Sequence, residues 1–139
     1  MRNLLVTLLA TSSVLSFSAA AGGMSLAEKD KAYEQYIASE KLESVEKINA
    51  KKITSSTSLS ESYVIINAQH NGNYLVKTAQ KCDDMDQQAV SLSRVSDLSL
   101  DKKTDHIVKP GSKVGECDIE SMYPITWEQR KYLTNVGRG

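Results

Sequence analysis

The stretch YVIINAQHNGNYLVKTA, residues 63–79, decides the fold class because it predicts a β-hairpin. Asn71-Gly72 lies between two runs rich in β-branched and aromatic residues, and Asn-Gly is a strong short-range signal for a hairpin turn. A two-residue turn there would mix polar and apolar residues on both faces, whereas a three-residue loop at 70–72 separates them. Register follows the face that must be buried. We therefore expect the longer loop, with Gly72 in the left-handed conformation that glycine adopts at low cost. The expected apolar face comprises Val64, Ile66, Ala68, Tyr74, Val76 and Thr78.

Further strands are predicted on both sides of this hairpin. AVSLSR (89–94) and ECDIESMYPI (116–125) alternate between apolar and polar residues, which is typical of half-buried strands. HIVKPG (106–111) predicts a short strand that ends at its Pro-Gly pair. ESVEKINA (43–50) indicates a weaker first strand, and KKITSSTSLSES (51–62), with seven hydroxyl residues, is either an exposed connection or an edge strand. In the 116–125 strand, the alternation places Cys117, Ile119 and Ser121 on one side.

A helix is expected at each end of this strand-rich region. Residues 25–42 begin with Ser25 and Glu28 at capping-box spacing, and Thr126 with Gln129 repeats the pattern before a short C-terminal helix. The fold class is therefore α+β: a small antiparallel sheet or partly closed barrel, with an N-terminal helix, a short C-terminal helix and one disulfide. The side chains expected to pack from the helices are Leu26, Tyr33, Tyr36, Ile37, Trp127, Tyr132 and Leu133. For the tyrosines of the N-terminal helix, the alternative is a tyrosine-lined contact surface.

The first 21 residues are predicted to be a secretory signal peptide. Arg2 supplies the positive start, residues 4–17 supply the apolar stretch, and small residues follow at a cleavage site. Five hydroxyl residues interrupt the apolar stretch, so it is a poor membrane-spanning helix, although an uncleaved anchor is the alternative. We expect the mature chain to start at Ala21 or Gly22, to form a single small domain over residues 22–139, to lack a transmembrane segment, and to be periplasmic or secreted.

The charge of the chain excludes several classes of partner. It has 17 Lys and Arg residues and 17 Asp and Glu residues, which gives a formal net charge of zero. Nucleic-acid binders normally carry a clustered basic face, so we expect no nucleic-acid partner. The balance also gives no reason to expect an anionic membrane surface as a partner.

The two cysteines, Cys82 and Cys117, are the only ones in the chain. In an oxidising compartment such a pair most simply forms a disulfide, and closing a loop of that size contributes roughly 3–4 kcal/mol in the chain-entropy model. A nucleophilic cysteine would need a nearby base, and His70 and His106 are the only histidines. A zinc site would need three or four ligands at ordered spacing, which the chain does not supply.

No other part of the sequence indicates catalysis or a cofactor. The acidic stretch after the first cysteine offers Asp83, Asp84 and Asp86, but it lacks the glycine and the distal glutamate of a calcium loop. Motifs of serine hydrolases, phosphate-binding loops and dinucleotide-binding folds are absent from the sequence. We therefore expect no catalytic residues, no metal and no cofactor.

The order of these elements resembles a family of small exported bacterial proteins that is classed only as a domain of unknown function. The resemblance covers roughly residues 33–126 and rests on a tyrosine–leucine strand followed by a cysteine, an alternating strand, and a second cysteine that begins C-x-I-x-x-x-x-P. The family implies an envelope or secreted location and a paired-cysteine fold, and it implies no activity. This chain departs from the pattern at Asp118, where a basic residue is common, and at Asp83-Asp84, where an apolar residue is common. The residues that carry the resemblance are Tyr74, Leu75, Cys82, Cys117, Ile119 and Pro124.

Two functional hypotheses from different classes follow. The first is a non-enzymatic binding or accessory module of the cell envelope, whose partner is an envelope protein or a small ligand. Its candidate binding face is the polar face of the hairpin, formed by Asn67, Gln69, Asn73 and Lys77. The alternative is a hydrolase-like enzyme that uses His106 and the carboxylates of the Cys82 loop. A deep pocket lined by His106 and residues 83–86 would favour the enzyme.

Overall fold

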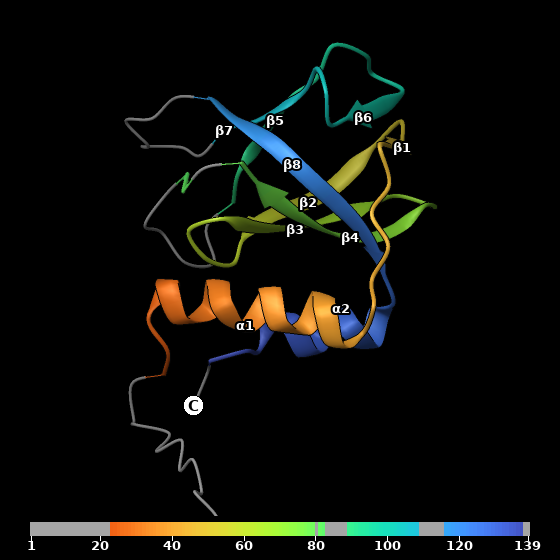
Figure 1. Ribbon diagram of the computed structural model, residues 1–139. Coiled ribbons are helices and arrows are strands. Elements are labelled where there is room, and N and C mark those ends of the chain that lie inside the picture. The colour runs from red at the N-terminus through yellow and green to blue at the C-terminus, as the bar shows by residue number, and fades with distance from the viewer. Residues whose placement is uncertain (1–22, 80, 83–88, 109–115, 138–139) are drawn as a thin grey trace, which may run out of the picture.

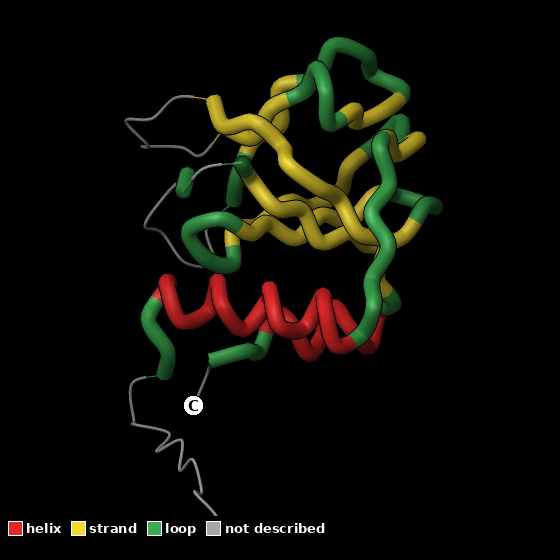
Figure 2. The backbone as a smooth tube through the Cα atoms, in the orientation of Figure 1, coloured by secondary structure: helices red, strands yellow, loops and turns green. Residues whose placement is uncertain are grey.

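A nearly closed antiparallel barrel forms the body of the protein, and two helices lie side by side along one side of it (Figures 1 and 2). The computed structural model describes residues 23–79, 81–82, 89–108 and 116–137. The predicted α+β class is confirmed. The strands of the barrel are β2 (Ile53–Ser58), β3 (Tyr63–Ala68), β4 (Gly72–Thr78), β5 (Ser91–Ser93), β7 (His106–Val108) and β8 (Glu116–Ile125), in the spatial order β2-β3-β4-β8-β7-β5.

The barrel closes where β2 meets the chain that leads into β5. Thr57 forms an isolated antiparallel bridge with Ala89. The Val90 amide donates to the Ser56 carbonyl at 3.0 Å, and the Ser56 hydroxyl donates to the Val90 carbonyl at 2.7 Å. The hydroxyl-rich stretch at 51–62 thus contains an edge strand of the sheet, one of the two expectations for it, and that edge is covered rather than open to other chains.

A separate two-stranded ribbon packs on the barrel core. It consists of β1 (Lys47–Asn49) and β6 (Ser99–Asp101), in which Ile48 lies opposite Leu100 and both side chains are buried. An isolated bridge between Val45 and Met122 joins the chain before β1 to β8. The weakly predicted first strand therefore exists, but it covers the core instead of joining the main sheet.

The predicted hairpin is confirmed, with its loop one residue earlier than expected. Ala68 pairs with Gly72, so the loop comprises residues 69–71, and the two strands keep the predicted faces. His70 (φ 69°) and Gly72 (φ 98°) both adopt left-handed conformations. The sequence indicated this conformation only at the glycine, because only a few per cent of residues with a side chain adopt it.

The hairpin is buried on both faces, which explains its run of apolar residues. One face points into the barrel, where Val64, Ile66 and Val76 belong to the interior core. The opposite face packs under the helices through Ile65 and Leu75. The sequence analysis assigned this second face a polar surface, and that assignment holds only toward its ends. The second core comprises Tyr33, Leu59, Tyr63, Ile65, Leu75, Ile125 and Leu133.

Strand β8 contains a bulge that the alternating pattern did not predict. Lys77 pairs with Ser121 and Thr78 pairs with Ile119, so Glu120 is an extra residue on β8. A bulge of this kind shifts the alternation of side chains by one residue. The expectation that Ser121 shares a side with Cys117 and Ile119 is therefore wrong, because Met122 takes the interior position instead.

Both helices begin at the predicted caps. Helix α1 (Leu26–Ser39) and helix α2 (Trp127–Thr134) each have the complete capping box that the sequence indicates. Leu133 is fully buried against the sheet. Trp127 and Tyr132 were expected to pack against the domain, but this expectation is largely wrong, because both side chains are 58% exposed. Tyr132 instead stacks on Tyr36 at the surface, with ring centroids 5.1 Å apart.

Candidate functional site

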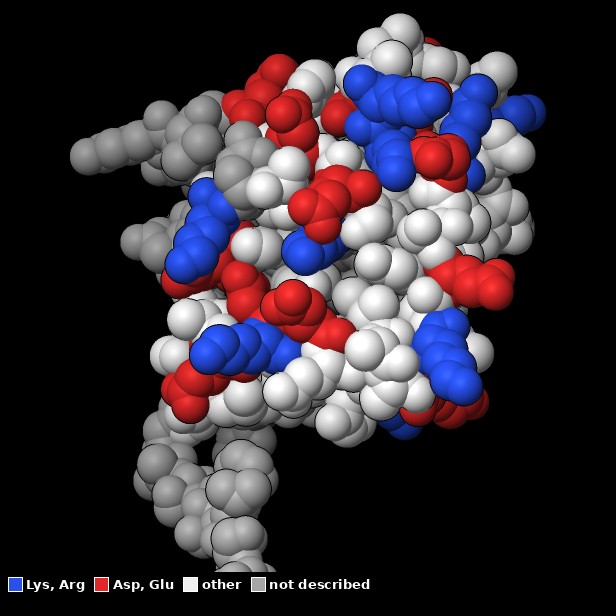
Figure 3. Space-filling model, in the orientation of Figure 1, with Lys and Arg blue, Asp and Glu red and all other residues white. Residues whose placement is uncertain are grey.

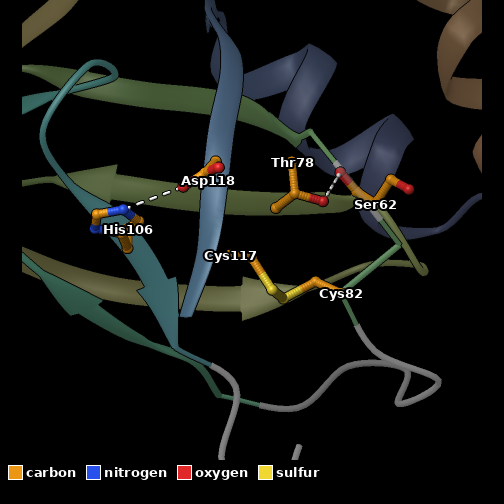
Figure 4. Close-up of a disulfide and its surroundings, with 6 residues drawn as sticks. All are labelled: Ser62, Thr78, Cys82, His106, Cys117 and Asp118. Carbon is orange, nitrogen blue, oxygen red and sulfur yellow. Dashed lines mark hydrogen bonds and ion pairs between the residues drawn. A yellow bond between two sulfur atoms is a disulfide. The ribbon is translucent and has the colours of Figure 1, made fainter. Parts of the chain in front are cut away.

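The disulfide between Cys82 and Cys117 fastens one end of the barrel (Figure 4). The two residues are 35 positions apart in sequence, their Cα atoms are 5.9 Å apart, and both are fully buried. The Cys82 amide donates to the Glu61 carbonyl at 2.9 Å, and the Thr78 hydroxyl donates to the Ser62 carbonyl at 3.2 Å. These contacts tie the end of β4 and the chain after it to the β2–β3 turn. The pair therefore holds strands together and offers no exposed thiol.

His106 lies near this end of the barrel, in a cluster with two carboxylates. Its Nε2 atom is 3.1 Å from Oδ1 of Asp118, and its Nδ1 atom is 3.8 Å from Oε2 of Glu116. Figure 4 shows the contact between His106 on β7 and Asp118 on β8. The carboxylates of the alternative hypothesis, residues 83–86, lie outside the described residues. Within the described parts of the chain, the His106 side chain contacts two surface carboxylates and does not line the groove described below.

The predicted polar face of the hairpin is largely engaged in contacts within the domain. Asn67 donates to Asn73 across the strands at 2.8 Å, and Arg130 of α2 donates to the same Asn73 oxygen at 2.7 Å. Asn73 is buried, and Arg130 also lies over the ring of Trp127, 5.8 Å from its centroid. Partial burial lowers the pKa of Arg130. This network attaches α2 to the sheet, so these polar side chains stabilise the fold.

Lys77, the third strand residue of that face, pairs with a neighbouring carboxylate. Its Nζ atom is 3.1 Å from Oε2 of Glu120, the extra residue of the β8 bulge. Burial alone would lower the pKa of Lys77, but the hydrogen bond and the charge of Glu120 raise it overall. Gln69, the remaining residue of the predicted face, is not on a strand. It is exposed in the hairpin loop and borders a groove.

This groove lies at the end of the barrel away from the disulfide and has a volume of about 430 Å³. Three connections form its walls: the β1–β2 connection, the β3–β4 loop, and the chain that precedes β6. Strand β4 begins beside the groove at Gly72 and runs toward Cys82 at the far end. The residues that line the groove are Asn49, Ala50, Lys51, Lys52, Gln69, His70, Asn71 and Leu98.

Hydrogen bonds between the three connections fix the walls of the groove. The Gln69 amide donates to the Lys52 carbonyl at 2.9 Å, and the Ala50 amide donates to the Leu98 carbonyl at 2.9 Å. A guanidinium nitrogen of Arg94 donates to the Ala50 carbonyl, also at 2.9 Å. Each wall is thus held by a neighbouring wall, so the groove is formed before any ligand arrives.

The electrostatics of the groove are one-sided. Lys51 and Lys52 are exposed, His70 lies beside them, and no lining residue is acidic. Neither lysine makes an ion pair within the described parts of the chain, whereas Lys77 and Lys102 each pair with a glutamate. Figure 3 shows several basic side chains over β1 and β6 with an acidic one among them, and acidic side chains along β8 with basic ones beside them.

Comparison with known proteins gives a family without an assigned activity. Residues 1–135 match the family described as "Family of unknown function (DUF6491)". The chain belongs to this family. No curated protein and no solved structure matches the chain significantly. The resemblance drawn from the cysteine pattern, to a family of unknown function, is therefore confirmed. Among the described helices of this DUF6491 protein, none has the length and apolar character needed to cross a membrane.

The groove of this DUF6491 protein was missed by the sequence analysis except for one residue. Gln69 was included in the candidate binding face, but Lys51 and Lys52 were assigned to a stretch expected to be an exposed connection or an edge strand. The signal that could have found the site is the adjacent lysine pair just before a strand, because no acidic residue follows it until Glu61. Leu98 carries no such signal, since only the fold brings it to the two lysines.

Proposed function

We propose that this protein is an exported, non-enzymatic binding or accessory module of the cell envelope, and that its binding site is the groove at the loop end of the barrel. The observation that carries the proposal is the groove itself, with two exposed lysines that have no ion-pair partner among the described residues. Uncompensated charge in a concave site raises the local concentration of ligands of opposite sign. A module of this kind needs no reacting group, only a fixed surface.

Export is supported by two independent features. The first 21 residues have the charged start, apolar stretch and small residues of a signal peptide. The paired cysteines are compatible with an oxidising compartment, where disulfides form and persist. On this proposal the domain begins at Gly22 or one residue earlier and works in the periplasm or outside the cell.

Preorganisation of the groove supports binding rather than a purely structural role. Gln69, Lys52, Ala50 and Leu98 are joined by backbone hydrogen bonds, so little loop ordering is needed when a ligand binds. Binding surfaces that are ordered in advance avoid a large part of the entropic cost of association. Seven of the eight lining residues are exposed, so they are not required by the core.

The test is site-specific photocrosslinking in intact cells that produce the protein naturally. A photoreactive amino acid replaces Gln69 in the groove, and the control places it at Glu128 on the exposed surface of α2. We expect a discrete adduct from position 69 that disappears when Lys51→Glu and Lys52→Glu are added. An adduct from the α2 position alone, or a groove adduct indifferent to the lysines, would place the binding site elsewhere. Loss of function from His106→Ala with unchanged stability would instead favour an enzyme.

A further inference from the structure

We infer that the groove binds an acidic, extended segment of a partner protein, in which an apolar side chain lies next to carboxylates. This inference rests on the proposed binding function and adds the chemistry of the occupant. Three kinds of lining residue support it: cations, carboxamides and one exposed leucine. Each kind corresponds to one component of such a segment.

The cations select the charge of the occupant. Lys51 and Lys52 are adjacent in the β1–β2 connection, and His70 lies across the groove on the β3–β4 loop, where a ring N–H can donate to the same anionic group. Because no lining residue is acidic, an incoming carboxylate meets no repulsion from the groove itself. Cationic ligands are disfavoured by the same charges, which gives the site its specificity.

The carboxamides favour a peptide backbone over a phosphate. Asn49, Gln69 and Asn71 each present a side chain that can donate and accept hydrogen bonds, as the N–H and C=O groups of an extended peptide require. Phosphate sites more often use arginine forks or the N-terminus of a helix. The lining residues include no arginine, and none of them belongs to a helix.

The apolar part of the groove selects a side chain. Leu98 is 59% exposed although it is a large hydrophobic residue, and Ala50 beside it is buried. The Ala50 amide is bonded to the Leu98 carbonyl, so the exposed leucine is held against the groove. Burying such a side chain against an apolar group of the ligand is favourable in proportion to the area removed from water. The combination of leucine and lysines matches an acidic peptide better than a small hydrophilic anion.

The experiment measures binding of a synthetic peptide to the purified mature domain by fluorescence anisotropy. The probe is a labelled short peptide with aspartates on both sides of a leucine. Two control peptides replace the aspartates by asparagines, or the leucine by serine. We expect both controls to bind more weakly than the probe, and we expect affinity to fall as salt is added because the charges are exposed.

Matched variants assign the binding to the groove. Lys51→Gln with Lys52→Gln should weaken binding of the probe about tenfold, since each exposed charge contributes modestly. Lys31→Gln with Lys131→Gln removes the same charge from exposed positions on the two helices and should leave binding unchanged. Leu98→Ser should weaken binding of the probe while leaving the serine control peptide unaffected. Thermal melts check that every variant is folded.

Several results would overturn the inference. Equal affinity for the probe and its asparagine control, or equal losses from the groove and helix variants, would show that the binding is nonspecific. Competition by inorganic phosphate at concentrations where sodium acetate has no effect would assign the groove to a phosphate group. Binding to vesicles that contain anionic phosphatidylglycerol, abolished by the groove variants, would assign it to a lipid surface. If the peptide fails while the lysine-dependent crosslink at position 69 persists in cells, this inference fails and the proposed function stands.

Discussion

Two tyrosines in the core beneath the helices differ in one hydrogen bond, and this difference gives a sharp prediction. Tyr33 and Tyr63 are in edge-to-face contact, with ring centroids 5.3 Å apart, and both are almost fully buried. The Tyr33 hydroxyl donates to the Leu133 carbonyl at 3.2 Å. The buried Tyr63 hydroxyl has no hydrogen-bond partner within the described residues. Replacement of each tyrosine by phenylalanine removes one hydroxyl and keeps the ring.

Tyr33→Phe should lower the stability of the domain, whereas Tyr63→Phe should not. Leaving a buried polar group unpaired costs about 1–3 kcal/mol. Tyr63→Phe removes such a group, so we expect the free energy of unfolding to stay the same or to rise by about 1 kcal/mol. Tyr33→Phe removes a hydrogen bond and leaves the Leu133 carbonyl with one partner fewer, so it should cost about 1 kcal/mol or more. The difference between the two variants is then about 1–2 kcal/mol, or several degrees in melting temperature.

The dependence on pH provides a second, independent readout of the same side chain. Burial, followed by the charge of Glu34, raises the pKa of Tyr63 above its ordinary value of 10.0. Above pH 10 the unfolded chain loses this proton while the folded chain keeps it. The stability that Tyr63 contributes is therefore complete below pH 10 and falls as the pH rises, by about 1.4 kcal/mol per pH unit. Tyr63→Phe abolishes this loss, so its advantage over the wild type should grow above pH 10.

Urea denaturation followed by circular dichroism at pH 7 and at pH 10.5–11 measures both effects, with equal m-values as the check on two-state behaviour. Tyr36 and Tyr74, whose pKa values burial also raises, are unchanged in every variant, so their contributions cancel. Destabilisation by Tyr63→Phe of more than about 1 kcal/mol at pH 7 would show that its hydroxyl is hydrogen-bonded in solution. That result, or an advantage that does not grow with pH, would refute the reasoning.

Three further predictions concern the disulfide, the mature terminus and His106. Cys82→Ala with Cys117→Ala should lower the free energy of unfolding by about 4 kcal/mol, because the bridge joins residues 35 positions apart and both side chains are buried. The mass of the unreduced wild-type protein should be lower by two hydrogens. Two freely alkylated thiols would contradict the bridge. N-terminal sequencing of the exported protein should start at Ala21 or Gly22, and an intact Met1 would disprove cleavage. His106→Ala removes an exposed contact with Asp118, so it should lower the free energy of unfolding by less than about 1 kcal/mol and leave binding intact. Loss of binding in a folded His106→Ala variant would count against the proposed groove.

Local signals in the sequence predicted the local parts of the fold. The Asn71-Gly72 turn and the burial rule gave the correct faces of the hairpin, and each capping box gave the start of a helix. The two cysteines were predicted to pair because no other partner exists in the chain. The hairpin and the helix starts depend on residues that are close together in sequence. The disulfide depends only on the presence of two cysteines in the chain.

The parts that were missed depend on contacts between distant segments. The bulge at Glu120 exists because β8 must pair with β4 while its two ends face different cores, and alternation within one strand cannot reveal that. The second core arises because the helices cover a face of the hairpin that carries both apolar and polar residues. The exposure of Trp127 follows from the rotation of α2, in which Leu133 faces the sheet and Arg130 reaches Asn73. Helical periodicity alone does not distinguish these faces.

On the proposed function, one end of the barrel provides stability and the other end provides the binding site. At one end, the fully buried Cys82–Cys117 bridge links the chain just after the hairpin to the start of β8. At the other end, the groove uses side chains that are nearly all exposed and contribute little to either core. Substitution of Lys51, Lys52 or Leu98 should therefore change what the domain binds without unfolding it. Because surface substitutions usually change stability by less than about 0.5 kcal/mol, a loss of binding in these variants can be assigned to the groove rather than to the fold.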